Sequence, residues 1–530
     1  MTNRNALLLG VAVLVLAALV AQMVIGPSAE NIGVACIVTA SSLSILLYIY
    51  WTRALDTHPL STYALFGFCF TTQMGALLFQ SGGGEAITRY LRQPGTTFGW
   101  LAAYQWTAMA AHAAYRVFSE RRAGANPRFA FSEGPLRRLL RVIGLYSAPS
   151  PGVLWAVSVF GLFGILFGGI PNTMGKVFHG MSFLAWAPFL IPIFIVEYGA
   201  SYARPSRQLP FVAAYTVFIA VLAMAANARA MMLSGLMTVS LFLALTALRS
   251  QARFKPKFLV YGVVLAAGLA VLSYPVNDLV TAMRIARKDR GHIDIFRMVE
   301  NTLYNFQRDD LLKAERSAGQ FISLNSNYDE LYFNSELEGR LVETKFHDNA
   351  LYFGSRLSAA DNERLLETTA DFLWAILPQP VLDKLGVDLA KKSVFFSMGD
   401  YMSYLGATGK VGGFRTGSGV AHGLALFGEA FLPVMFLLFF VVFWSIDLLA
   451  YALPSGRVAV SALGLLGIWP LFQYGICTES ITGLLSYIVR GLPQNVLIYT
   501  VAIACASLGL RMWSRMPARR LQPLVARGGV

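Results

Sequence analysis

Residues 6–25 of the chain read ALLLGVAVLVLAALVAQMVI, a run of twenty residues without a charge. A helix of this length matches the thickness of the hydrocarbon core of a membrane, about 30 Å. In that core each backbone N–H and C=O must be paired within its own segment, so the run must be helical. It is longer than the apolar part of a signal peptide, and we therefore expect a retained first membrane helix rather than a cleaved signal.

Similar runs recur along the chain and identify its class. Of the 530 residues, 56% are hydrophobic and 14% are charged, whereas about a quarter of a soluble domain is charged. We expect an all-α polytopic membrane protein with about twelve spanning helices. They are predicted at residues 6–26, 31–51, 62–80, 97–117, 152–171, 183–200, 210–227, 231–248, 258–275, 426–450, 458–477 and 494–511.

These ranges divide the chain into three regions. Residues 1–275 are expected to form nine helices, residues 276–425 one large loop outside the membrane, and residues 426–530 three more helices and a basic tail. Stretches of the loop such as 309–317 and 358–377 combine helix-forming residues with apolar positions about 3.6 residues apart. The loop is therefore expected to be mainly helical.

Lysine and arginine are unevenly distributed over the short connections. The segments expected in the cytoplasm carry 21 of them and the short outer segments carry five. Because cytoplasmic loops are enriched in these residues, we expect both termini in the cytoplasm of a bacterium and the large loop on the periplasmic face of the inner membrane. The net charge of +14 then indicates contact with membrane lipids rather than with nucleic acid.

Two arginines lie in outer connections close to the membrane. Arg229 follows Ala226-Asn227-Ala228 in a tight connection, and Arg490 lies between the last two apolar runs. A guanidinium near the bilayer usually pairs with a carboxylate, with carbonyls or with a phosphate. The alternative for each is a structural arginine, which at Arg229 would extend to the membrane surface from a helix end.

A third group of cations follows the ninth predicted helix. If this segment is helical, Arg284, Arg287 and Lys288 share one face. Such a face could bind a diphosphate through bidentate hydrogen bonds. The alternative is a solvated amphipathic segment that touches anionic headgroups.

The end of the large loop is rich in glycine. Seven glycines lie between Gly406 and Gly423, and the stretch 412–419 is followed by His422. With Arg415, these residues could form an anion site beside a base; the alternative is a flexible start to the next helix. No zinc-binding motif is present and the six histidines are scattered, so we expect neither a metal nor a cofactor.

Several of these features occur together in one protein family. The family features are Arg229 after Ala-Asn, the late large loop, and the stretches Ile376-Leu377-Pro378-Gln379-Pro380, Gly412-Gly413-Phe414-Arg415-Thr416-Gly417 and Leu426-Phe427-Gly428-Glu429-Ala430-Phe431. The chain thereby resembles the Wzy-type polymerases, which join lipid-linked oligosaccharide repeat units into O-antigen or exopolysaccharide. It is similar, more distantly, to the O-antigen ligases. The Arg-x10-Gly pattern of some members is not cleanly present, because Leu426 stands where the glycine is expected.

The resemblance implies a metal-independent inverting glycosyltransferase of polysaccharide and lipopolysaccharide biosynthesis. It would act on undecaprenyl-diphosphate-linked oligosaccharides at the periplasmic face, with a chain-length regulator as a protein partner. On this interpretation the diphosphate is bound by Arg229, Arg284, Arg287 and Arg490. The catalytic residues would be Arg229, Arg415 and His422, with His347, Asp348 or Glu429 as other candidates for the base.

Two other functions remain open from the sequence. A ligase would share the fold and chemistry but transfer finished polymer to lipid A core. A transporter or flippase would need charged residues inside several helices. These are few: the main ones are Glu197, Glu429 and Asp447.

Overall fold

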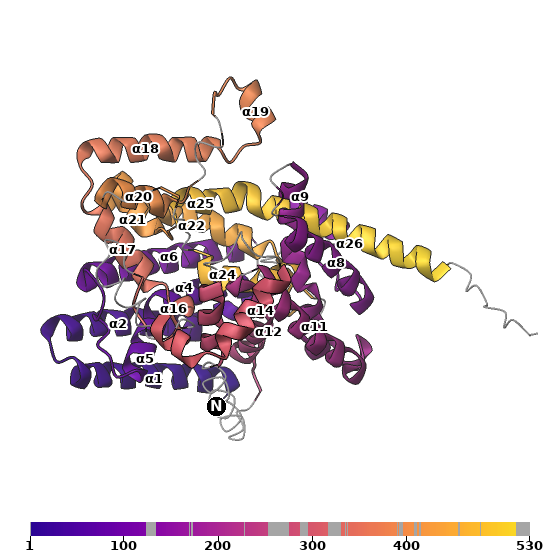
Figure 1. The fold of residues 1–530 in the computed structure, drawn as a ribbon, viewed down its shortest axis with the longest axis horizontal. Coiled ribbons are helices and arrows are strands. Elements are labelled where there is room, and N and C mark those ends of the chain that lie inside the picture. The colour runs from indigo at the N-terminus through magenta and orange to yellow at the C-terminus, as the bar shows by residue number, and fades with distance from the viewer. Residues whose placement is uncertain are drawn as a thin grey trace, which may run out of the picture.

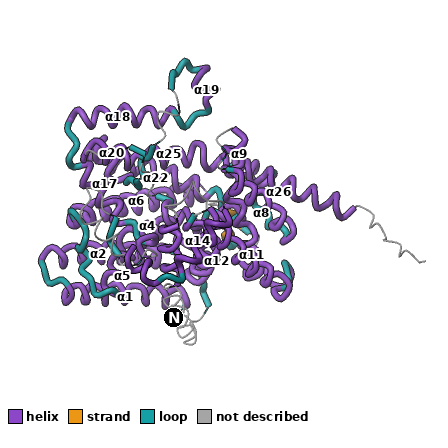
Figure 2. The backbone as a smooth tube through the Cα atoms, viewed as in Figure 1, coloured by secondary structure: helices purple, strands orange, loops and turns teal. Residues whose placement is uncertain are grey.

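The computed structural model describes most of the chain: residues 2–122, 134–168, 170, 173–226, 228–252, 275–286, 295–315, 330–333, 335, 338–389, 391, 396–407, 411–412, 415–453, 456–476 and 479–515. In these residues the regular structure is helical apart from one two-stranded sheet (Figures 1 and 2). Eight of the helices in the described part of the chain are long and apolar enough to cross a membrane. The architecture suggests a multi-pass, all-helical membrane protein.

The N-terminal part forms one side of the helix bundle. Its elements are α1 (Asn3–Ile25), α2 (Ala29–Thr52), α3 (Ala54–Thr57), α4 (Pro59–Cys69), the π-helix η1 (Phe70–Met74), α5 (Gly75–Gly82) and α6 (Pro94–Arg122). The side chains of Thr2 and Ser28 cap α1 and α2 by accepting from backbone amides three residues later. Helix α1 packs on α2, and α2 packs on α6; the three run nearly parallel in Figure 1.

The central part packs through small residues. It contains α7 (Pro135–Val142), α8 (Pro151–Phe167), α9 (Thr173–Met181), η3 (Ser182–Phe189), α10 (Leu190–Tyr198), η4 (Gly199–Ser201), α11 (Pro205–Ala226) and α12 (Arg229–Arg249). A Cβ at Gly161 of α8 would lie 1.9 Å from the backbone N of Ala185 in η3. Only glycine allows these two helices to approach so closely, as is common between membrane helices.

The described part of the region expected to be the large loop is mainly helical, with short irregular connections between its helices. Residues 275–286 and 309–315 are helical, and the other elements are α14 (Ile295–Phe306), α16 (Glu338–Leu341), α17 (Thr344–Gly354), α18 (Ala359–Trp374), α19 (Gln379–Lys384) and α20 (Met398–Ala407). Ser358 and Asp361 form a capping box at the start of α18. Figure 1 shows α18 and α19 at one edge of the molecule.

The C-terminal part completes the bundle. Its elements are α21 (Gly419–Phe427), η7 (Gly428–Ala430), α22 (Phe431–Asp447), β1 (Ala450–Ala452), β2 (Val458–Val460), α23 (Ala462–Leu466), α24 (Ile468–Tyr474), α25 (Ile481–Ser486), the π-helix η8 (Tyr487–Gly491) and α26 (Leu492–Arg515). Strands β1 and β2 are antiparallel, with Ala450 opposite Val460. Helix α22 packs on α6, and α24 packs on α4.

Eight of the twelve expected helices correspond to the eight candidate spans. Of the others, 97–117 lies within α6, which carries buried polar side chains such as Gln105 and His112. The range 152–171 contains the shorter α8. The range 258–275 lies outside the described residues, apart from residue 275.

The expected helix at 458–477 is not a single helix. The segment begins as strand β2, continues as α23, and turns at Gly467 into α24. Pro470 lies in the first turn of α24 and has no N–H to donate to the carbonyl four residues before it. Hydropathy predicted the apolar run correctly but could not detect this interruption.

A buried polar network joins four elements inside the bundle. The carboxylate of Asp447 on α22 accepts from the backbone N of Ser61 (3.1 Å) and from its Oγ (2.6 Å). Because Ser61 donates its hydroxyl to Asp447, the Nε2 of His112 on α6 must donate to Ser61 Oγ (2.9 Å), while its Nδ1 lies 2.7 Å from Tyr48 OH on α2. The intramembrane charge of Asp447 is thus satisfied within the protein.

Candidate functional site

A polar cavity of about 330 Å³ lies at one end of the bundle. It is lined by Glu343, Phe346, His347, Thr416, Gly417, Tyr474 and Glu479. These residues come from three segments that are far apart in the sequence: the start of α17, the stretch before α21, and the residues between α24 and α25. The segment 85–97 contacts both α17 and Asn31. Asn31 lies at the junction of α1 and α2, at the opposite end of α1 from residue 2. The cavity therefore lies at the end of the bundle opposite the N-terminus.

Asp348 fixes α17 to the bundle. Its fully buried carboxylate accepts from the backbone N of Arg92 (2.8 Å), the backbone N of Gln93 (3.0 Å) and Thr97 Oγ1 (3.0 Å). Lys345 Nζ lies 3.8 Å from the same carboxylate and donates to the Tyr90 carbonyl. Asp348 was a candidate base, but in this arrangement its oxygens are already occupied by donors.

The π-helix η1 provides a second attachment. A π-turn leaves carbonyl groups without the usual helical donor. The Thr71 carbonyl accepts from the backbone N of Glu343 (2.7 Å), and the Thr72 carbonyl accepts from Thr344 Oγ1 (2.7 Å). The start of α17 is therefore held deep against a membrane helix, and this places Glu343 in the cavity.

His347 is a neutral imidazole. Its Nδ1 lies 2.7 Å from Ser418 Oγ, which also accepts from the backbone N of Ala421 as the cap of α21. Ser418 Oγ thus joins His347 of α17 to the start of α21. Burial lowers the pKa of His347 to about 4. The ring is uncharged at neutral pH.

Two carboxylates complete the polar lining. Glu343 is buried, and its Oε1 accepts from Gln473 Nε2 at 2.9 Å. Glu479 is partly accessible to solvent, and its partial desolvation in the cavity wall and, to a smaller extent, the Asp400 carboxylate raise its pKa. A carboxyl group with a raised pKa in a cavity is typical of acid–base sites. Neither glutamate was a candidate from the sequence, although Glu479 is the only acidic residue between the last two apolar runs.

The glycine-rich segment forms one wall through its backbone. Asp400 accepts from the backbone N of Gly412 (3.2 Å) and of Arg415 (3.0 Å). The Arg415 guanidinium donates to Ser403 Oγ, and Arg415 does not line the cavity. A Cβ at Gly417 would lie 2.5 Å from the Glu479 carbonyl, so glycine at this position allows the two walls to meet.

His422 lies beside the cavity but not in its wall. Its Nε2 is 2.9 Å from Thr369 Oγ1 on α18, and its Nδ1 accepts from the backbone N of Ile481 on α25 at 3.3 Å. The side chain is fully buried. His422 therefore joins three helices, and both its ring nitrogens are occupied.

A basic cluster, defined here as Lys176, Lys391 and Arg490, lies at the same end of the bundle. Lys391 Nζ donates to the carbonyls of Ala375 and Leu377 at the end of α18. Burial lowers the pKa of Lys391, and the positive charges of Arg490 and Lys176 lower it further. Among the described residues no carboxylate forms an ion pair with any member of the cluster.

Of the other three predicted diphosphate ligands, the structure describes the side chain of Arg284. Arg284 is half-buried on the helical residues 275–286 and does not line the cavity. Arg229 begins α12, which confirms the tight connection after α11, but its side chain lies outside the described residues. Arg287 also lies outside them.

An apolar groove of about 190 Å³ adjoins the polar cavity. The two share Tyr474 as a lining residue. The groove is otherwise lined mainly by aliphatic and aromatic side chains, and these include Tyr487 of η8, the turn that also carries Arg490. Polar cavity, apolar groove and basic cluster are thus neighbouring parts of one region.

Comparison with known proteins identifies no relative: no family model, no curated protein and no solved structure matches the chain.

The geometry predicts that His422 stabilises the fold rather than taking part in chemistry. His422→Leu leaves the buried Ile481 amide without its acceptor, at a cost of about 1–3 kcal/mol, and removes the link to Thr369, whose hydroxyl keeps its bond to the Leu365 carbonyl. We expect a lower thermal midpoint for the purified protein in detergent, and an unchanged midpoint for Glu479→Gln. An unchanged midpoint in His422→Leu would contradict the structural role.

Proposed function

We propose that the protein is a polymerase that joins undecaprenyl-diphosphate-linked oligosaccharide repeat units into O-antigen or a related surface polysaccharide. The observation that carries the proposal is the cavity in which Glu343, Glu479 and a neutral His347 meet at the end of the bundle, next to an apolar groove. An enzyme acting on a lipid-linked sugar needs this combination of a polar reaction site and an apolar site for the lipid.

The reaction is a single displacement. The acceptor hydroxyl oxygen attacks C1 of the sugar bound to diphosphate, the C1–O bond to phosphate breaks, and its electron pair leaves with the diphosphate. The hydroxyl proton passes to Glu479, whose raised pKa makes it a stronger base than an ordinary glutamate. Neutral His347 orients the acceptor hydroxyl by a hydrogen bond. Glu479 thus takes the place of His422 as the proposed base.

The basic cluster is the proposed site for the carrier diphosphate. Of the cations expected to bind the diphosphate, Arg490 lies near Lys391 and Lys176. In the described structure no carboxylate forms an ion pair with Arg490. Arginine and lysine at a membrane surface stabilise phosphate charge in a medium of low dielectric constant. The isoprenoid chain would lie in the apolar groove beside Tyr487.

Deletion of the gene in the producing strain tests the function. A polymerase deletion leaves lipid A core bearing a single repeat unit, or no polymer, as seen on a lipopolysaccharide gel. A ladder of normal length in the deletion strain would contradict the proposal. Long polymer not attached to core would instead identify a ligase.

The role of Glu479 predicts a pH dependence. The base must be deprotonated, so the rate of the purified enzyme on a synthetic lipid-linked repeat unit rises with pH as Glu479 ionises. Because its pKa is raised, this rise lies above the usual glutamate range near 4.3. Glu479→Gln is expected to lower kcat about 10²–10⁴-fold and to abolish the rise. Glu367→Gln, exposed on α18, is the matched control, and equal effects of the two changes would refute the assignment.

The basic cluster predicts a change in substrate binding. Arg490→Gln removes a charge-assisted contact worth about 1.5–3 kcal/mol, so KM for the lipid-linked repeat unit should increase about tenfold or more. Arg207→Gln removes an exposed charge from the first turn of α11 and should leave KM unchanged. A KM for Arg490→Gln equal to that of the wild-type enzyme would place the diphosphate elsewhere.

A further inference from the structure

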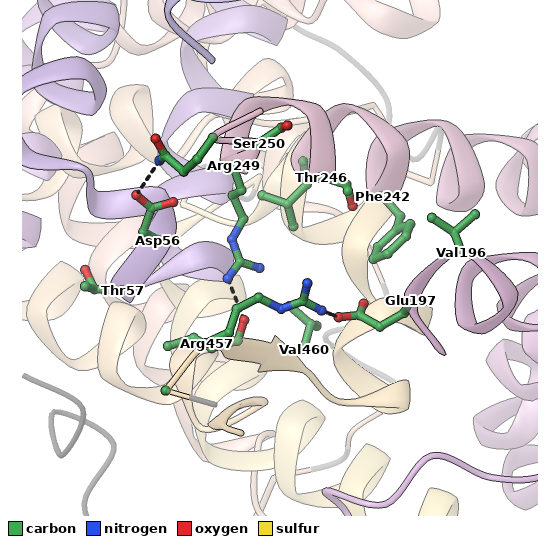
Figure 3. A pocket seen from close by; sticks show the side chains of 14 residues that line it. Asp56, Thr57, Val196, Glu197, Phe242, Thr246, Arg249, Ser250, Arg457 and Val460 are labelled. Carbon is green, nitrogen blue, oxygen red and sulfur yellow. Dashed lines mark hydrogen bonds and ion pairs between the residues drawn. The ribbon is translucent and has the colours of Figure 1, made fainter. Parts of the chain in front are cut away.

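A second cavity, of about 610 Å³, lies at the end of the bundle that holds the N-terminus. Figure 3 shows its side chains, which come from α3, α10, α12 and β2. The N-terminal segment adjoins this end, because the backbone N of Asn3 donates to the Ala252 carbonyl and Arg4 pairs with Asp56. The cavity is separate from the polar site, because the two share no lining residue and lie at opposite ends of the bundle.

Two guanidinium groups point into this cavity. Arg249 donates to the Val458 carbonyl at 2.5 Å, and Arg457 forms an ion pair with Glu197. Figure 3 shows both groups directed into the same space from opposite walls. In the described structure Arg249 has no carboxylate within ion-pair distance, while the nearby Asp56 is paired with Arg4 at 3.0 Å.

The charges around the cavity do not balance. Arg249, Arg457, Asp56 and Glu197 line the cavity. Arg457 is paired with Glu197, and Asp56 is paired with Arg4 from outside the lining, so among the described residues Arg249 is the lining cation without a carboxylate partner. Like charges that share a partly buried space repel each other, and an anion between them removes the repulsion. Guanidinium groups match the oxygen geometry of a phosphate and are weakly hydrated. The cavity is therefore suited to one phosphate group.

The apolar part of the cavity wall indicates which class of molecule carries the phosphate group. Val196, Phe242 and Leu245 line the cavity beside the arginines. They lie near the ends of α10 and α12, both of which belong to candidate membrane spans, so the cavity opens at the level of lipid headgroups. A ligand that fits this lining has an anionic head and an apolar continuation.

We propose that this cavity binds the phosphate headgroup of an anionic phospholipid. Basic pockets between membrane helices commonly hold such headgroups. The binding ties the ends of α10 and α12 to β2 and is independent of the chemistry at the opposite end.

The test measures lipid retention. The full-length protein, reconstituted in nanodiscs of mixed phosphatidylglycerol and phosphatidylcholine and released in mild detergent, is examined by native mass spectrometry. We expect phosphatidylglycerol to be retained in preference, and Arg249→Gln to reduce this retention about tenfold. Arg207→Gln, which removes an arginine that does not line the cavity, should leave retention unchanged. Equal retention of both lipids, or equal losses in the two variants, would overturn the proposal.

Two further variants keep the test valid if Arg249→Gln does not fold. Glu197→Gln releases Arg457 from its ion pair and should increase phosphatidylglycerol retention. Thr246→Phe narrows the cavity without changing its charge and should decrease retention. The opposite result in either variant would contradict the site, and tight binding of soluble glycerol phosphate to the lipid-free protein would identify a soluble phosphate as the ligand instead.

Discussion

The position of the polar cavity depends on one buried carboxylate, that of Asp348. Removing a charge from water costs several kcal/mol unless donors replace the lost solvent. Asp348 obtains these donors from the backbone of Arg92 and Gln93 and from Thr97, all at the start of α6. These three hydrogen bonds fix α17 against the bundle. His347, the residue before Asp348, and Glu343, the N-cap of α17, both line the cavity.

The sequence predicted what depends on local composition. Eight apolar runs became candidate spans because the length of an apolar helix is set by the bilayer. The segment 359–374 is helical, as the periodicity of 358–377 predicted. The range 458–477 was wrong because hydropathy averages over the effects of Gly467 and Pro470. An interruption of this kind is determined by backbone hydrogen bonding, and a hydropathy averaged over a window of residues contains no information about it.

The candidate site was predicted less well, for a related reason. A histidine or carboxylate is available for chemistry only if the fold leaves it without partners, and the partners come from distant segments. His422 looked available beside the glycines, yet Thr369 and the Ile481 amide occupy both its nitrogens. Glu479 looked unremarkable, yet its neighbours in the fold raise its pKa. Tertiary contacts thus give His422 a structural role and make Glu479 the proposed base.

The two ends of the bundle differ in how their charged side chains are paired, and the neighbouring residues explain the difference. At the polar cavity the acids Glu343 and Glu479 are kept apart from the basic cluster, with the apolar groove next to both. At the opposite end Arg457 and Glu197 are already paired, and the unmatched charge is that of Arg249. A site with one residual positive charge and an apolar wall is suited to retaining a phospholipid. A site with separate acidic and basic groups is suited to the proposed reaction of a lipid-linked sugar.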